Sequence, residues 1–322
     1  MHKLDKKKLL GPVLLFLAAL IWGTSFVAQE VGANGGVGSF TYQATRNALG
    51  ALALLAVCVV KDLWQKKKGI YHPPTPREKK ILWLGGLACG CLLCVATVLQ
   101  QFGIADVDTS PGKAAFVTAL YIVFVPVIAL ALRRFSQPHV YACVVVALVG
   151  LWLLCMSGSS LTQGDIFVIL CSVAFAFHIT VVDLVVPHVD GVKLSCIQFT
   201  VAALISAVGM WITEQPDMGV ILQNWFPIFY SGIFSAAIAY TLQILGQKHT
   251  QPTVACLLMS LESVFAVVTG MILLPETSAQ SAREWIGMAV IFVAIVLAQV
   301  PLRYGRRKGP KESESAQTGA EK

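Results

Sequence analysis

Residues 9–29 read LLGPVLLFLAALIWGTSFVAQ and contain no charged side chain. A helix of this length spans the hydrocarbon core of a bilayer, which is about 30 Å thick and needs roughly 20 apolar residues. Basic residues precede the run, as in a secretory signal peptide, but the apolar stretch is too long for that class of segment. We therefore expect residues 9–29 to form an uncleaved membrane-spanning helix.

The rest of the chain has the same character. Of its 322 residues, 56% are hydrophobic and only 13% are charged, and the mean hydropathy is +0.72. Soluble proteins carry roughly 25% charged residues, so a soluble fold of this chain would expose too much apolar surface. The sequence predicts an all-α polytopic membrane protein with ten transmembrane helices. The expected spans are 9–29, 40–60, 81–103, 111–132, 138–156, 165–186, 194–213, 224–245, 252–273 and 284–302.

The positions of Lys and Arg predict the orientation of these helices. With the N-terminus inside, 21 of the 24 basic residues fall in cytoplasmic segments, and Arg283 alone falls in an outside loop. This bias favours a protein with both termini in the cytoplasm. The net charge of +7 therefore reflects topology, and it does not indicate a nucleic-acid partner.

A weak internal repeat divides the chain into two halves. Leu99-Gln100-x-x-Gly103 matches Leu242-Gln243-x-x-Gly246, and Leu120-x-x-x-Phe124 matches Leu261-x-x-x-Phe265. Each half holds five expected helices, and an odd number makes the second half inverted relative to the first. Inverted repeats place a binding site at their interface near the midplane and permit alternating access.

The expected organisation follows from this repeat. The first five-helix repeat covers residues 9–156, the second covers 165–302, and residues 303–322 form a disordered cytoplasmic tail. The tail is polar and rich in Ser, Glu and Lys, a composition that is typical of disorder.

The nine cysteines all fall inside apolar runs, which argues against a disulfide framework. Cys89, Cys91 and Cys94 are close in sequence, but on a helix only Cys91 and Cys94 share a face, and no His or acidic residue is nearby. We interpret them as packing residues. We expect no metal site and no cofactor.

Three sets of motifs resemble the EamA-type drug/metabolite transporter superfamily. They are residues 21–29 (IWGTSFVAQ) with Arg46; 99–103 (LQQFG) and 113–121 (KAAFVTALY) with Pro126; and 261–265 (LESVF) with Glu276 and Gly287. The resemblance implies a ten-helix inverted-repeat permease for small metabolites such as amino acids, with a central cavity and with helices five and ten at the periphery. Where Trp22-Gly23 would recur in the second half, the chain has Ala176-Phe177-His178.

Polar residues inside a membrane are costly to insert and are therefore candidates for function. Glu262 lies midway along a span, either as a proton-coupling or substrate-amine-binding carboxyl or as a structural hydrogen-bonding group. Arg46 either meets a substrate carboxylate, pairs with an internal acid or snorkels to the interface. His178 either titrates or packs as a hydrogen-bonded core residue.

Other side chains are candidates to line the cavity. Aromatic rings provide apolar contact with one polar group, which suits amphipathic solutes. We expect Lys113, at the outer end of a span, to snorkel, and Asp183, at the inner end of another, to be solvated or part of a gate. The candidate binding or coupling residues are Trp22, Thr24, Ser25, Gln29, Arg46, Gln100, Tyr121, His178, Tyr240, Gln243 and Glu262, with Tyr230 as a further aromatic.

The predicted function is secondary transport of a small organic molecule, in the direction of export, across the plasma (inner) membrane. Alternatives are a passive channel, a structural membrane protein, or a carrier of nucleotide sugars or phosphate esters. The last class needs several intramembrane cations, whereas only Arg46 and Lys113 lie in spans. No intramembrane protease motif is present, so we do not expect an enzyme. The expected partners are the substrate, the lipid bilayer, a coupling proton and, as one open assembly, a second copy in a homodimer.

Overall fold

The computed structural model describes residues 6–106, 111–135, 137–155, 162–273 and 282–299. Glu276, residues 300–302 and the predicted tail 303–322 lie outside them. Every regular element assigned to the described residues is helical. In chain order they are α1 (Lys6–Asn34), α2 (Ser39–Lys67), α3 (Pro76–Ile104), α4 (Pro111–Thr118), α5 (Tyr121–Ala131), α6 (Pro138–Cys155), α7 (Gln163–Val185), η1 (Val186–His188), α8 (Gly191–Thr213), α9 (Met218–Gln223), α10 (Trp225–Tyr230), the π-helix η2 (Ser231–Ala239), α11 (Tyr240–Gln247), α12 (Pro252–Met259), α13 (Leu261–Leu273) and α14 (Ala282–Gln299).

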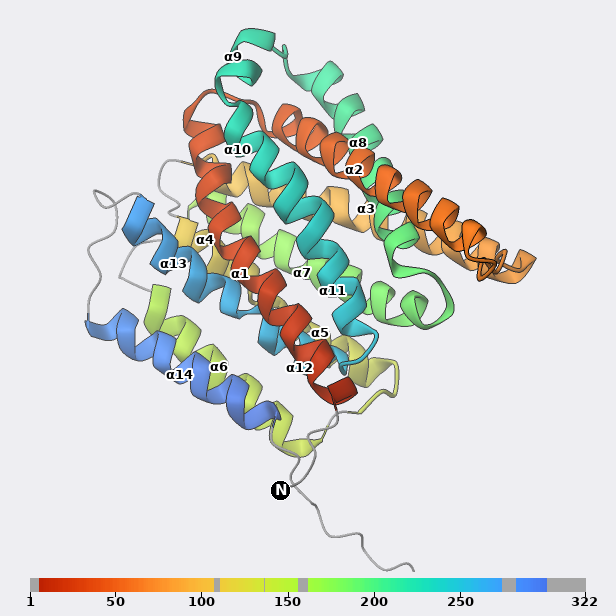
Figure 1. The fold of residues 1–322 in the computed structure, drawn as a ribbon. Coiled ribbons are helices and arrows are strands. Elements are labelled where there is room, and N and C mark those ends of the chain that lie inside the picture. The colour runs from red at the N-terminus through yellow and green to blue at the C-terminus, as the bar shows by residue number, and fades with distance from the viewer. Residues whose placement is uncertain (1–5, 107–110, 136, 156–161, 274–281, 300–322) are drawn as a thin grey trace, which may run out of the picture.

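These elements confirm a polytopic helical membrane protein. Within the described ranges, eight helical segments are long and apolar enough to cross a bilayer. The fifth and tenth expected spans contain only shorter apolar helices, over residues 138–150 and 285–298. Ten transmembrane helices thus stay a prediction. The two shorter segments belong to α6 and α14, which pack side by side at one edge of the bundle (Figure 1).

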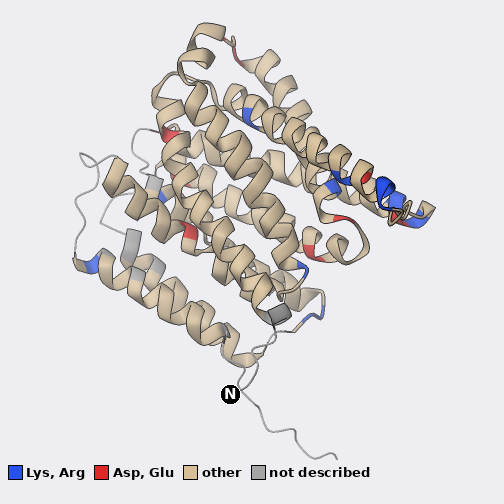
Figure 2. Cartoon of the chain, in the orientation of Figure 1, with Lys and Arg blue, Asp and Glu red and all other residues tan. Residues whose placement is uncertain are grey.

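Several helices begin at side chains that cap their free backbone N–H groups. Thr75 and Glu78 form a capping box at the start of α3, and Thr162 and Asp165 form another at the start of α7. Asp190 accepts hydrogen bonds from the first backbone amides of α8. Each cap satisfies donors that have no partner inside the helix. The long α2 and α3 are joined at the end where Lys and Arg gather (Figure 2).

Three of the predicted spans are not uniform α-helices. Span 111–132 is interrupted at Ala119 and Leu120, and span 252–273 is interrupted at Ser260. Span 224–245 contains a π-helix of nine residues, Ser231–Ala239, between α10 and α11. Such interruptions are not visible in hydropathy, and π-helical turns are frequent at functional sites.

The centre of the bundle forms where α1 packs closely against α13. A Cβ atom at Gly23 would lie 2.3 Å from Cβ of Phe265 and 2.8 Å from the backbone oxygen of Glu262. Only glycine permits this approach. On the opposite edge from α6 and α14, α2 and α8 lie against each other along their length (Figure 1).

Candidate functional site

A small cavity lies inside the bundle. Its walls come from α1, α2, α3, α4, α5, α7, η2, α11, α12 and α13. All the lining residues are buried. They are Trp22, Ser25, Phe26, Gln29, Arg46, Gln100, Thr118, Tyr121, Phe175, Ile179, Ser235, Tyr240, Gln243, Met259 and Glu262.

Arg46 provides a positive charge at this cavity, and only 2% of the residue is exposed. Its Nη1 donates to Oε1 of Gln29 at 3.1 Å, and its Nη2 donates to Oγ of Ser235 at 3.2 Å. Its Nε has no hydrogen-bond partner among the described residues. Burial excludes snorkelling, and the ion pairs of the described residues do not include Arg46. A buried guanidinium held by neutral groups favours an anionic ligand.

Glu262 provides the acid of the same cavity. Its Oε1 accepts a hydrogen bond from the hydroxyl of Tyr121 at 3.0 Å, and both residues are buried. Tyr121 directly follows the interruption between α4 and α5, and Glu262 is the second residue after Ser260. The interruptions in the two helices therefore bring these two side chains together.

The remaining walls combine amides with aromatic rings. Nε2 of Gln100 donates to Oγ1 of Thr118 at 3.2 Å, whereas Oε1 of Gln243 has no partner in the described structure. The rings of Trp22 and Tyr240 meet edge to face with centroids 4.7 Å apart. The indole Nε1 of Trp22 also has no partner in that part of the chain. The cavity thus offers donors and acceptors beside apolar surface.

Nine of the eleven candidate residues line this cavity, and their role in binding stays a prediction. The two exceptions are Thr24 and His178. The hydroxyl of Thr24 bonds to the backbone oxygen of Ile21 and to the hydroxyl of Tyr230, and neither Thr24 nor Tyr230 is among the residues that line the cavity. Nε2 of His178 lies 3.1 Å from Oε1 of Gln198, and its ring packs against the ring of Tyr240 behind the cavity wall.

Two expectations about charged residues need correction. Snorkelling was wrong for Lys113, because its side chain is only 15% exposed and its Nζ lies 2.8 Å from Oδ2 of Asp165. The carboxylate of Asp183 forms an ion pair with Arg134 rather than being free in solvent, and its role as part of a gate stays a prediction. In both cases a partner more than 45 residues away in sequence satisfies the charge.

The structure adds cavity residues that had not been singled out. They are Phe26, Thr118, Phe175, Ile179, Ser235 and Met259. Most are apolar, and in a membrane span an apolar residue that faces a cavity looks like one that faces lipid. Two of them could have been found from their position next to candidate residues, because Thr118 lies three residues before Tyr121 and Phe26 follows Ser25.

In the part of the chain that the structure describes, eight candidate spans surround a cavity with polar and apolar walls, which is the architecture of a polytopic membrane protein with an internal site. A model of the EamA-like transporter family matches residues 9–156 and again residues 162–299. This chain therefore belongs to the EamA-like transporter family, within the drug/metabolite transporter superfamily. The family indicates a transporter rather than an enzyme.

Individual relatives agree with this assignment. An uncharacterized transporter of Clostridium kluyveri is 22% identical over 296 residues, covering 88% of this chain and 91% of the relative. Another, of Archaeoglobus fulgidus, is 23% identical over 299 residues, covering 91% and 87%. A solved crystal structure, titled only as that of a protein, matches with a TM-score of 0.68 at 17% identity, over 89% of this chain and 96% of that one. This last likeness concerns the fold alone.

Proposed function

We propose that this transporter exports a small zwitterionic metabolite, such as an amino acid, by alternating access. The observation that carries the proposal is that Arg46 and Glu262 line one cavity whose walls are entirely buried. Export is proposed from the resemblance to the drug/metabolite transporter superfamily. The proposed location is the plasma (inner) membrane, with both termini in the cytoplasm, on the basis of the distribution of Lys and Arg.

The chemistry of the cavity suits a ligand with two opposite charges. Among the described residues, Nε of Arg46 and Nε1 of Trp22 have no hydrogen-bond partner, and they are donors for a carboxylate. The carboxyl group of Glu262 and Oε1 of Gln243, which also has no partner in that part of the chain, are acceptors for an ammonium group. Arg46 and Glu262 bond to other residues rather than to each other, so both charges are available to a ligand. A proton on Glu262 would compete with the ammonium group and thereby couple transport to pH.

Repeat-related contacts support two inverted five-helix repeats, over 9–156 and 165–302. A Cβ atom at Gly103 would meet Val168 and the backbone oxygen of Gly164, and one at Gly246 would meet Leu15 and the backbone oxygen of Gly11. Val168 and Leu15 are 153 residues apart in sequence, and so are Gly164 and Gly11. The two glycines thus meet equivalent partners in the opposite halves of the chain. By this correspondence, the second-half counterpart of Trp22-Gly23 is Phe175-Ala176, one residue before the stretch Ala176-Phe177-His178 that the sequence suggested.

Tyr121 and Glu262 occupy matching positions in the two repeats, 141 residues apart, and they contact each other. Residues that are equivalent by a two-fold axis touch only when they lie next to that axis. This contact supports a cavity centred where the two proposed halves meet, which is the expected position of a transporter site.

The buried walls of the cavity favour alternating access over a passive channel. A solute cannot enter a cavity lined only by buried residues unless helices move. A carrier of phosphate esters is less compatible, because Arg46 is the one Lys or Arg among the described residues that line the cavity.

Uptake into proteoliposomes loaded with individual amino acids and other metabolites, with and without a proton gradient, tests the proposal. We expect saturable exchange of zwitterions in the wild type and a loss of about 10-fold or more in apparent affinity for Arg46→Gln, because a charged hydrogen bond is removed. Arg77→Gln is the control, since Arg77 is exposed at the start of α3. Equal affinity in the wild type and Arg46→Gln would contradict the carboxylate role, and flux that does not saturate would favour a channel.

A further inference from the structure

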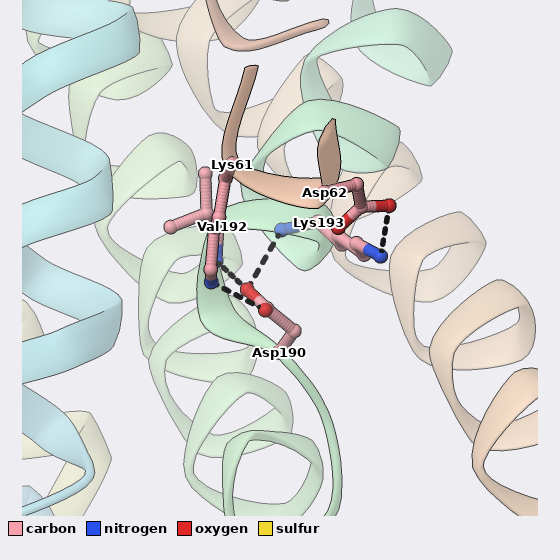
Figure 3. Close-up of polar contacts among 5 residues, drawn as sticks. All are labelled: Lys61, Asp62, Asp190, Val192 and Lys193. Atoms are coloured by element: carbon pink, nitrogen blue, oxygen red, sulfur yellow. Dashed lines mark hydrogen bonds and ion pairs between the residues drawn. The ribbon is translucent and has the colours of Figure 1, made fainter. Parts of the chain in front are cut away.

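The cytoplasmic ends of α2 and α8, as assigned by the charge distribution, are joined by two ion pairs. Nζ of Lys61 lies 2.5 Å from Oδ2 of Asp190, and Nζ of Lys193 lies 2.7 Å from Oδ2 of Asp62. The second oxygen of Asp190 accepts a hydrogen bond from the backbone N–H of Val192 at 3.0 Å (Figure 3). The same carboxylate therefore caps α8 and forms an ion pair with α2. The start of α8 is therefore fastened to the end of α2.

The other ends of the same two helices are joined by a helix cap. Glu214 directly follows α8, and its carboxylate accepts from the backbone N–H groups of Phe40 and Thr41, each at 2.8 Å. The hydroxyl of Thr41 donates to the same group at 2.7 Å. Without Glu214 these amides at the first turn of α2 have no partner inside their helix.

The contacts between α2 and α8 at their two ends are equivalent in the proposed repeat. A shift of 152 residues converts Thr41 into Lys193 and Asp62 into Glu214. The contact between Thr41 and Glu214 therefore corresponds to the contact between Lys193 and Asp62. The proposed repeat therefore places one polar contact between α2 and α8 at each end of this helix pair.

The position of α2 and α8 agrees with a static role. Among the residues that line the cavity, α2 contributes only Arg46 and α8 contributes none. The interrupted helices α4, α5, α12 and α13 each contribute one residue to the cavity, and α4 packs against α13 and α5 against α12. Movement of these segments opens a path to the cavity, whereas separation of α2 from α8 opens a seam beside it.

We infer that α2 and α8 form a fixed frame, joined at both membrane surfaces, which stays closed while α4–α5 and α12–α13 move around the cavity. This inference rests on the proposed alternating access and specifies which helices carry it out. Opening either end of the frame breaks two ion pairs or strips a helix cap, and it exposes no cavity wall except Arg46. The frame therefore keeps Arg46 at a constant position during transport.

Cross-linking distinguishes a frame from a gate. In a variant whose nine native cysteines are replaced, Asp62→Cys with Lys193→Cys permits a cross-link between α2 and α8. Gly112→Cys with Val267→Cys joins α4 to α13, because a Cβ at Gly112 would lie 2.9 Å from a methyl group of Val267. With a short thiol cross-linker we expect the first pair to keep uptake within about twofold of its reduced form, and the second to lose about 10-fold or more until reductant is added.

Reversible loss of uptake on cross-linking Asp62→Cys to Lys193→Cys would overturn the frame. Spin labels at Leu52 on α2 and Leu204 on α8, both exposed at the outside of the bundle, provide a second measurement that needs no flux. The frame predicts one unchanged distance with and without a mixture of the common amino acids, and a second distance population would refute it. Absence of saturable uptake in the uncross-linked protein would instead refute the proposed function, and the spin-label distances would still decide the frame.

Discussion

Gly23→Ala places one methyl group at the close contact between α1 and α13, two helices that line the cavity. The new Cβ would lie 2.3 Å from Cβ of Phe265 and 2.8 Å from both the backbone oxygen of Glu262 and the backbone nitrogen of Ala266. Carbon atoms pack at about 3.5–4.0 Å, so α1 and α13 must separate by more than about 1 Å. Two of the three atoms belong to the backbone and cannot rotate away.

The expected cost follows from overpacking, which typically destabilises by about 1–3 kcal/mol. We expect the upper end, about 3 kcal/mol, because the backbone of α13 must move. At about 2 °C per kcal/mol for a large chain, Tm should fall by about 6 °C. The displaced α1 also carries Trp22, so transport should weaken as well.

Thermal unfolding of the purified protein in detergent measures this change. Gly219→Ala is the matched control, because Gly219 is exposed and its nearest new neighbour is a side-chain oxygen of Asp217 at 3.1 Å. The control should change stability by less than about 0.5 kcal/mol. If Gly23→Ala unfolds at the same temperature as Gly219→Ala, the close approach of α1 to α13 is wrong.

Three further perturbations test charged groups. Glu262→Gln keeps the shape of the cavity but holds no exchangeable charge, so proteoliposome uptake should no longer respond to a pH gradient. Lys113→Met leaves the carboxylate of Asp165 buried without its ion-pair partner, and thermal unfolding should show a loss of about 3 kcal/mol. Burial alone raises the pKa of Asp190, but the hydrogen bond from Lys61 and the backbone N–H groups of α8 hold that pKa below its ordinary value of 3.8. Because the pKa of Asp190 is lower in the folded state, its contribution to stability is complete above about pH 4 and is lost as the pH falls further. The loss is at most about 1 kcal/mol, since the pair is partly exposed. Asp190→Asn should remove this pH dependence of stability.

Each of these three has a control of the same chemistry. Glu78→Gln removes an exposed acid, Lys66→Met removes an exposed base and Asp217→Asn alters an exposed helix cap. Proton-dependent uptake by Glu262→Gln would exclude coupling through this carboxyl. Equal stability of Lys113→Met and Lys66→Met would refute the buried ion pair. If Asp190→Asn loses stability at acidic pH as the wild type does, Asp190 is not the cause of that loss.

Much of the cavity was predictable because its polar residues are costly inside a membrane. Arg46 and Glu262 are conspicuous against apolar neighbours, and each lines the cavity. Lys113 is equally conspicuous, yet it is paired with Asp165 instead. Sequence identifies that a polar group is inside a span, but the rotation of the helix decides what that group faces.

The class of protein was determined by the sequence alone, because spanning a bilayer is a local property. Length and apolar composition suffice for each segment, and no contact between segments is needed, so the stretch at residues 9–29 and its counterparts identify a membrane protein. Only the tertiary structure decided which residues meet. The bond from Tyr121 to Glu262 joins positions 141 residues apart, and Phe175 and Ile179 face the cavity rather than lipid. These facts depend on helix rotation, on the interruptions at Leu120 and Ser260 and on the π-helix, and packing between helices determines all three, whereas hydropathy determines none.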